Sequence, residues 1–155
     1  MTKYIVRNLC KDDYDSNYLQ LLCQYFSINV DVISFADFTD YIDKLQSTHQ
    51  IVIIENINDN IPSKNNNTPY IIGSSAIFIE TKIIHNFGKV AHIEDVIVHN
   101  EFRGKGIGKM LIEKCIEVAK QNGCYKIILD CSEHNCEFYE KCGFTQKGAQ
   151  MAMYF

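Results

Sequence analysis

Apolar residues recur along this chain with two different spacings, which divide it into strands and helices. Runs rich in Ile and Val predict strands over residues 4–7, 50–55, 70–82, 89–99 and 125–130. Apolar residues three and four positions apart predict amphipathic helices over residues 13–26, 35–45, 107–121 and 136–141. The elements follow one another without an internal repeat or linker, so we expect a single domain over residues 1–155.

Residues at the helix ends support these boundaries. Ser34 followed three positions later by Asp37 predicts a capping box at the start of the second helix. Gly123 marks the end of the third helix, because glycine readily adopts the left-handed conformation found just beyond helix ends. Asn135 is expected to cap the last helix, and Gly143 is expected to stop it.

The helix over residues 107–121 is long enough to connect two parallel strands. Strands 89–99 and 125–130 should therefore lie parallel, joined by a right-handed connection. We expect Gly73 to break its strand, and residues 144–155 to supply a final strand or hairpin. The predicted element order is β-α-α-β-β-β-α-β-α-β.

A polar stretch rich in asparagine, residues 56–68, separates two of the strands. Such a composition is typical of a mobile hairpin loop, and an insertion is tolerated there more easily than elsewhere. We therefore expect this segment to carry no catalytic residue.

A glycine-rich sequence separates a strand from the helix that follows it, and it contains Arg103, Gly104, Gly106 and Gly108. Glycines at such a turn let the backbone approach a ligand closely, and the first N–H groups of a helix attract an anion. A Walker loop requires Ser or Thr after Gly-Lys, whereas Met110 stands here. A dinucleotide fingerprint requires a longer interval before its last glycine. By itself the pattern is compatible with a plain turn as well as with the phosphates of another cofactor, so the rest of the chain has to decide.

The composition, with 46% hydrophobic and 22% charged residues, is that of a globular protein. No apolar run approaches the length of a bilayer span, and the first residues contain no extended apolar signal region. We expect a cytoplasmic protein that does not bind membranes. The net charge of −4 gives no reason to expect a nucleic acid partner. The seven cysteines are scattered and include no C-x-x-C pair, which indicates reduced, buried thiols, Cys131 and Cys142 among them, and no metal site.

Three features occur together: the order of elements, the loop from Arg103 to Gly108, and the stretch from Asn135 to Phe144 that contains a Phe-Tyr pair. Together they resemble the GCN5-related N-acetyltransferases (GNAT) over nearly the whole chain. The resemblance implies an α/β fold of the GNAT acyltransferase type, in which helices flank a central, mixed and twisted sheet.

Four blocks make the resemblance more specific, namely Lys82–His85, His92–Asp95, Cys124–Cys131 and Phe138–Phe144. They are similar to stretches of the eukaryotic glucosamine 6-phosphate N-acetyltransferases. That resemblance implies transfer of the acetyl group of acetyl-CoA to the amine of D-glucosamine 6-phosphate. The product would be N-acetyl-D-glucosamine 6-phosphate, which serves the synthesis of UDP-N-acetylglucosamine.

The resemblance also implies where acetyl-CoA binds. A backbone N–H of the central strand, here that of Val96, would hold the acetyl carbonyl, and the loop amides would hold the pyrophosphate. The residues implied in cofactor binding are Asp95, Val96, Ile97, Val98, Arg103, Gly104, Lys105, Gly106, Ile107, Gly108, Lys109, Asn135 and Tyr139. No metal is implied.

Three side chains are implied in catalysis. Tyr139 resembles the tyrosine that protonates or hydrogen-bonds the departing CoA sulfur. Asp130 would orient the acceptor amine and favour the loss of its proton, and Glu94 would be a further catalytic residue beside it. Because Glu94 and Asp95 are neighbours on a strand, we expect them on opposite faces, and either of them could face the acceptor. Direct attack by the amine requires no cysteine nucleophile.

The residues implied in binding the amino sugar are Ser27, Lys82, Ile83, Ile84, His85, Glu94, Asp95, Asp130, Cys131 and Tyr154. Lys82 and His85 would serve the sugar phosphate. Tyr154 stands where the resembled enzymes commonly carry an arginine, so this chain lacks one cationic partner for the phosphate. The resemblance further implies a homodimer in which the last strand packs against the partner subunit and helps to complete the acceptor pocket.

Two other functions remain compatible with the sequence. The same fold could acetylate another small amine or a protein amino group. It could also serve as a non-catalytic module that binds acyl-CoA. The intact glycine loop, Asp130 and Tyr139 favour an enzyme over such a module.

Overall fold

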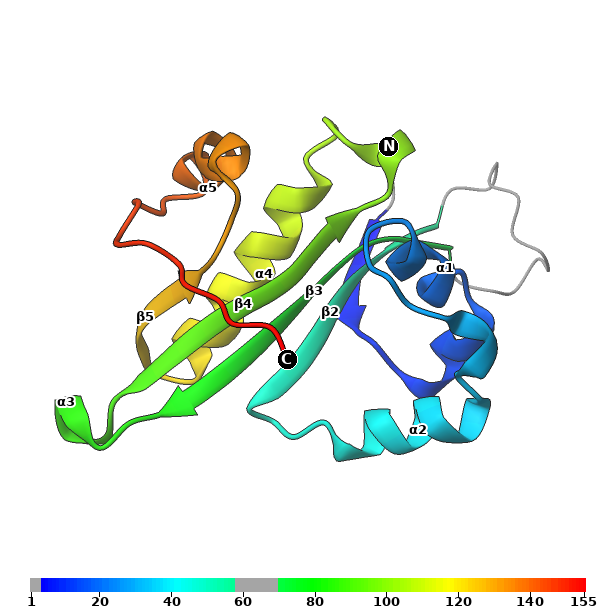
Figure 1. Cartoon of the computed structure of the whole chain (residues 1–155), viewed down its shortest axis with the longest axis horizontal. Helices are drawn as coiled ribbons and strands as arrows, with labels where there is room; N and C mark the ends of the chain where they lie inside the picture. The colour runs from blue at the N-terminus through cyan, green and yellow to red at the C-terminus, as the bar shows by residue number, and fades with distance from the viewer. Residues whose placement is uncertain (1–3, 58–69) are drawn as a thin grey trace.

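Five strands form one mixed sheet in the computed structural model, which describes residues 4–57 and 70–155 (Figure 1). The strands are β1 (Tyr4–Asn8), β2 (His49–Asn56), β3 (Tyr70–Thr81), β4 (Lys89–Val98) and β5 (Cys124–Leu129). They are ordered β1-β2-β3-β4-β5, and the first three pairings are antiparallel. The last pairing, β4 with β5, is parallel, which confirms the predicted crossover. Most of the Asn-rich segment 56–68 lies outside the described residues.

The helices cover both faces of the sheet, and they are α1 (Tyr18–Cys23), α2 (Phe35–Lys44), α3 (Ile84–Phe87), α4 (Ile107–Gln121) and α5 (Cys136–Lys141). Helix α4 packs its buried side chains, such as Leu111 and Ile112, on one face. Helices α1 and α2 close a second core on the other face, with Leu21 and Phe38 buried there. In the view of Figure 1, α4 lies behind β4 and the other two helices lie beside β2.

Helix α4 begins and ends where its apolar period predicts, from Ile107 to Gln121. Gly106 precedes it with a φ of 82°, and Gly123 follows it with a φ of 71°, so both ends use the left-handed conformation. The capping box of α2 is also confirmed, because the Ser34 hydroxyl and the Asp37 carboxylate each accept a hydrogen bond from the other residue's N–H at 3.1 Å.

The helix expected over residues 13–26 is wrong in its length. The segment instead forms a 3₁₀ turn, Lys11–Asp15, followed by the short helix α1. The Asp13 carboxylate is buried and accepts two hydrogen bonds from Arg7, both at 2.7 Å. The Ser16 hydroxyl donates to the Asp13 carbonyl, which a continuing helix would need for its own bonds. Side-chain bonds therefore end the first turn.

Two other expectations about the backbone are wrong. Gly73 does not break β3; a Cβ atom there would lie 3.0 Å from the Cγ2 of Ile107, so the glycine lets α4 approach the sheet. Residues 144–155 form no helix or strand, although all of them are described. They cross β5 and β4 as an irregular segment (Figure 1), with Met151 95% and Tyr154 93% exposed. This segment pairs with no strand of the described chain, so no ladder of hydrogen bonds holds it extended.

Candidate active site

A β-bulge in β4 lies at the centre of the candidate site. Ile93 packs with α4, whereas Ile97 packs with α1 and α2 on the opposite face of the sheet. Two residues four positions apart would share a face in a regular strand. The register with β3 shifts at this point, and Asp95 has a φ of 52°. An extra residue in β4 therefore reverses the alternation of its side chains.

The bulge corrects the prediction that Glu94 and Asp95 lie on opposite faces. Glu94 points away from α4 because its neighbour Ile93 points toward α4. Asp95 also points away from α4, since it lies two positions before Ile97 and lines a cavity beside α1 and α2. Both carboxylates thus occupy one face of the sheet, and both are exposed.

The same place marks the separation of β4 from β5. Their parallel pairing ends with Ile93 opposite Leu129. Beyond this pair β4 continues to Val98, whereas β5 stops and the chain goes on to Asp130. The backbone of β4 from the bulge onward is therefore not paired with β5 in the described sheet, and the N–H of Val96 lies in this stretch.

The glycines of the loop before α4 have two different roles. Gly104 and Gly106 have φ values of 72° and 82°, and no atom of the described chain lies within 4 Å of the position that a Cβ would take. They permit the turn, and the space beside them, just before α4, is open. Gly108 instead permits packing, because its Cβ would lie 3.1 Å from the ring of Phe138 on α5.

Tyr25, which the sequence did not single out, supports this loop. Its hydroxyl lies 2.8 Å from the carbonyl oxygen of Val98 and 2.7 Å from Oδ1 of Asn100. The guanidinium of Arg103 lies 5.2 Å from the centre of the Tyr25 ring, within the range of a cation–π contact. The segment after α1 is thereby tied to the end of β4 and to the loop. Only this long-range contact identifies Tyr25, so no local sequence signal could have found it.

Tyr139 lies on α5 between two aromatic rings, those of Phe138 and Phe144. Burial, followed by the neighbouring thiols of Cys131 and Cys142, raises the pKa of its hydroxyl to about 12. No residue of the described chain makes a hydrogen bond with that hydroxyl. It is therefore protonated at neutral pH and available to donate to a ligand.

Glu94 and Asp130 interact electrostatically. Burial, followed by the negative charges of Asp130 and Asp95, raises the pKa of Glu94. A carboxylate with a raised pKa is a stronger base than an ordinary one, so Glu94 is suited to accept a proton. The side-chain amide of Gln150 donates to Asp130 at 3.1 Å, a contact that the prediction of a strand for this segment did not anticipate.

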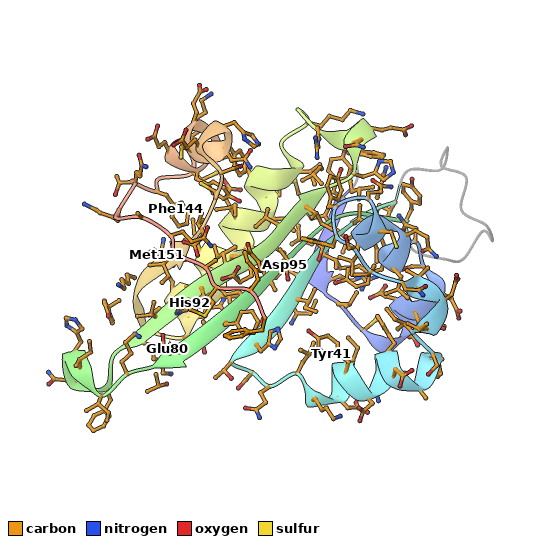
Figure 2. All side chains as sticks on the ribbon, viewed as in Figure 1. Tyr41, Glu80, His92, Asp95, Phe144 and Met151 are labelled. Atoms are coloured by element: carbon orange, nitrogen blue, oxygen red, sulfur yellow. The ribbon has the colours of Figure 1, made fainter. Side chains whose placement is uncertain are left out.

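Two cavities adjoin these residues. One of about 380 Å³ lies between α1, α2 and the sheet, and its lining is apolar except for a few groups that include Tyr41, Ser74 and Asp95. Figure 2 labels Tyr41 on α2 and Asp95 on β4 at its two sides. The other, of about 580 Å³, lies between β5, α5 and the irregular C-terminal segment. Asp130, Cys131 and Tyr139 all line it.

Within one chain, Lys82 and His85, the residues expected to bind the sugar phosphate, lie far from the Glu94 carboxylate. Lys82 is six positions beyond Ala76, the residue that pairs with Glu94, and a strand rises about 3.3 Å per residue. The separation along the hairpin is therefore roughly 20 Å. Lys82 Nζ is 2.8 Å from Glu80 Oε1, and the other oxygen of Glu80 is 3.0 Å from His92 (Figure 2).

The remaining expected residues are also placed. Ile83 and Ile84 are 84% and 62% exposed at the tip of the β3–β4 hairpin, and the ring of His85 lies 4.6 Å from that of Tyr125. Ser27 is exposed in the segment after α1. These residues and Tyr154 are therefore accessible rather than gathered into one pocket.

The loop residues expected around acetyl-CoA differ in their contacts. Lys105 lies over the ring of Phe102, and Lys109 pairs with Glu113 at 3.7 Å. Asn135 occupies the N-cap position of α5 as predicted, but its side chain makes no capping bond and donates to the Ser132 hydroxyl at 3.2 Å. It stabilises the turn between β5 and α5 instead.

Two other features, a metal cluster and a membrane-spanning helix, are absent from residues 4–57 and 70–155. No cluster of three or more His, Cys, Asp or Glu side chains there could hold a metal ion. None of the described helices is both long enough and apolar enough to cross a membrane.

The stretch of β4 that is unpaired with β5 and the glycine loop before α4 are the places where the resemblance implies that acetyl-CoA binds. Comparison with known proteins shows the family itself. Residues 17–144 match the acetyltransferase (GNAT) family, and the chain belongs to that family. The GNAT fold predicted from the sequence is thereby confirmed.

The chain is similar to particular members of the family. It is 39% identical over 148 residues to glucosamine 6-phosphate N-acetyltransferase 1 of Dictyostelium discoideum, covering 96% of this chain and 88% of that protein. It is 37% identical over 155 residues to the glucosamine 6-phosphate N-acetyltransferase of Candida albicans, covering 98% and 96%. The crystal structure of the Arabidopsis thaliana glucosamine-6-phosphate N-acetyltransferase superposes with a TM-score of 0.87 at 34% identity, covering 99% of both chains.

Proposed function

We propose that this protein transfers the acetyl group of acetyl-CoA to the amine of D-glucosamine 6-phosphate, giving N-acetyl-D-glucosamine 6-phosphate. The observation that carries the proposal is the similarity, along almost the whole chain, to two enzymes named for this reaction. The fold alone would not choose the acceptor, because GNAT proteins share one architecture while acting on different amines. The substrate assignment therefore rests on the sequence identity of 37–39% with these two enzymes.

Acetyl-CoA fits the half of the site formed by β4, α4 and α5. Gly104 and Gly106 leave the space that a pyrophosphate needs, next to N–H groups that have no partner within the helix. The backbone of β4 after the bulge is free on its β5 side, so the N–H of Val96 is suited to hold the acetyl carbonyl. A donor fixed in this way stabilises the negative charge that develops on the oxygen during attack.

The acceptor amine is an ammonium ion at neutral pH and must lose a proton before it attacks. Glu94, whose pKa is raised, is the base that the site offers, and Asp130 orients the amine beside it. Tyr139 then donates from its hydroxyl to the CoA sulfur as the thioester breaks. With a pKa of about 12, this hydroxyl is a weaker acid than a thiol, so Tyr139 acts chiefly by hydrogen bonding rather than by complete proton transfer.

Binding of the sugar phosphate by Lys82 and His85 requires a second copy of the chain. Lys82 and His85 lie at the far end of the hairpin, too distant to reach a phosphate whose amine is at Glu94. The hairpin tip and the C-terminal segment expose large apolar side chains, including Phe87 at 71% and Met153 at 77%. Exposed apolar patches mark interaction surfaces. We therefore propose a homodimer in which the hairpin tip of one subunit completes the acceptor site of the other.

An acceptor panel tests the proposed function. Acetyl-CoA is offered with glucosamine 6-phosphate, glucosamine, a polyamine and a peptide with a free amino group, and the acetylated product is identified by mass. The proposal expects the phosphorylated sugar to have the highest kcat/KM. An equal kcat/KM for unphosphorylated glucosamine, or preferred acetylation of the polyamine or peptide, would contradict the substrate assignment.

Sedimentation of the protein at the 17.9 kDa mass of one chain would contradict the dimer.

A further inference from the structure

Two thiols meet beside the proposed catalytic residues. The sulfur atoms of Cys131 and Cys136 lie 3.9 Å apart, and all seven cysteines of the chain are reduced in this structure. The prediction that Cys131 is buried is wrong: it is exposed and Cys136 is partly exposed, so small molecules in solution can reach them. Both line the cavity of about 580 Å³ that also contains Asp130 and Tyr139. The reaction proposed above uses neither thiol as a nucleophile.

We propose that Cys131 and Cys136 are a reversible modification site, at which exchange with a small disulfide such as glutathione disulfide forms an internal disulfide. The effect on catalysis argued below rests on the proposed function, whereas the formation of the bond does not. This dithiol would connect acetyl transfer to the thiol–disulfide balance of the surroundings.

The exchange proceeds in two steps. One protein thiolate attacks a sulfur of the small disulfide, forms a mixed disulfide and releases one small thiolate. The second protein thiolate then attacks the protein sulfur of that mixed disulfide and releases the other small thiolate. The two protons lost by the cysteines are taken up by the two released thiolates. The protein dithiol is oxidised by two electrons, and the small disulfide is reduced by two.

The geometry favours the second step. A disulfide bond is about 2.0 Å long, so the two sulfurs must approach by roughly 1.9 Å from their present 3.9 Å. Cys131 follows β5 and Cys136 begins α5, and the chain between them forms only a single 3₁₀ turn, Glu133–Asn135. No strand pairing has to break for the sulfurs to meet. The small disulfide has access because Cys131 is exposed.

The bond would act on both sides of the proposed reaction centre. Cys131 directly follows Asp130, and Cys136 begins α5 three positions before Tyr139. Drawing the two cysteines together changes the distance between the acceptor carboxylate and the tyrosine. A displacement of about 1 Å in such a site can reduce the rate by roughly 10²-fold.

Solution pH should control how fast the bond forms. Partial desolvation, followed by contact with Cys136, raises the pKa of the Cys131 thiol. Because only the thiolate reacts, exchange should accelerate as the pH rises toward that pKa.

The test uses the full chain in glutathione buffers in which reduced glutathione exceeds glutathione disulfide. Under these conditions a lone cysteine stays largely unmodified, because the thiol reduces its mixed disulfide back, whereas a neighbouring second cysteine displaces glutathione. Wild type is compared with Cys136→Ser and with Cys23→Ser, which removes an exposed cysteine at the end of α1. Intact mass and peptide mapping report the bond. The rate is measured by chromatography of the acetylated sugar. An assay that detects released CoA with an aromatic disulfide reagent is avoided, because that reagent would itself oxidise the two cysteines.

We expect wild type and Cys23→Ser to lose two hydrogens, to show a Cys131–Cys136 linked peptide and to lose roughly 10²-fold in rate, which a reductant restores. Cys136→Ser should keep its mass and its rate. Absence of the linked peptide from wild type would overturn the inference, and so would a linked peptide with unchanged rate. If reduced wild type does not acetylate glucosamine 6-phosphate, the proposed function fails, while the mass result still decides whether the disulfide site exists.

Discussion

The two ends of the β3–β4 hairpin differ in how many of the proposed site residues a single chain brings together there. At the bulge end, a single chain brings together the open part of β4, the glycine loop, Tyr139 and two carboxylates. At the tip, Lys82 and His85 stand roughly 20 Å away among exposed apolar side chains. The residues proposed for the cofactor thus lie together within one chain, whereas those proposed for the sugar phosphate lie apart from them. Each prediction below separates these two halves.

The largest effect is expected in the glycine loop. Gly106→Asp should weaken acetyl-CoA binding by about 10²- to 10³-fold, the loss of two hydrogen bonds to a charged group at roughly 1.5–2 kcal/mol each. The new carboxylate would occupy the open space that we propose for a phosphate. Gly123→Asp is the matched control, because Gly123 has a similar φ and equally open surroundings at the other end of α4. Calorimetry giving equal affinities for the two variants would contradict the assignment.

Tyr139→Phe should lower kcat by about 10²- to 10³-fold, at the lower end of the contributions of general acid–base catalysis. The affinity for acetyl-CoA should change little, since the ring and its aromatic neighbours remain. The pKa of about 12 adds a second expectation: the wild-type rate should show no loss from Tyr139 ionisation through moderately alkaline pH. Steady-state kinetics across pH measures both. Unchanged kcat in the variant would leave Tyr139 with a packing role only.

A smaller effect is expected at the tip. Lys82→Ala should raise the KM for glucosamine 6-phosphate by roughly tenfold, the effect of one charge-assisted hydrogen bond of about 1.5 kcal/mol, and should leave the KM for acetyl-CoA unchanged. Lys44→Ala provides the control, since Lys44 also pairs with a carboxylate on the surface but lies on α2. A shift in the acetyl-CoA KM instead would mean that the two halves are not separate.

The smallest effect is a change in pH dependence. Glu94 acts as a base when it is deprotonated, so kcat should rise with pH as Glu94 loses its proton. Its pKa is raised in part by the charge of Asp130, and removing that charge lowers the pKa. Asp130→Asn should therefore move the acidic limb of kcat to lower pH, in addition to reducing the rate. If the acidic limb of the kcat–pH profile does not move, it reports the ionisation of a group other than Glu94.

The sequence predicted those parts of the fold that depend on local signals. Helix α4 and the capping box of α2 are set by apolar spacing and by residues adjacent in sequence, and both were confirmed. The early helix failed because the Arg7–Asp13 pair and the Ser16 bond override a correct apolar period. Those bonds connect a strand to a turn, and periodicity contains no information about them.

The candidate site divides in the same way. The glycine loop can be read directly from its residues, because left-handed turns select glycine. The shared face of Glu94 and Asp95 could not be predicted, since a bulge depends on how β3 pairs with β4. The C-terminal strand was expected from its apolar residues, yet a strand needs a partner, and residues 4–57 and 70–143 provide none for residues 144–155.

Mixed dimers test most directly whether two chains complete one acceptor site. Lys82→Ala and Asp130→Asn chains are each purified, shown to have low activity at a limiting concentration of glucosamine 6-phosphate, and then allowed to exchange subunits. If Lys82 serves the site of the other subunit, each mixed dimer contains one intact site, and an equal mixture should recover about a quarter of the wild-type rate. If Lys82 serves its own chain, every site keeps a defect, and a mixture no more active than its two components would contradict the account.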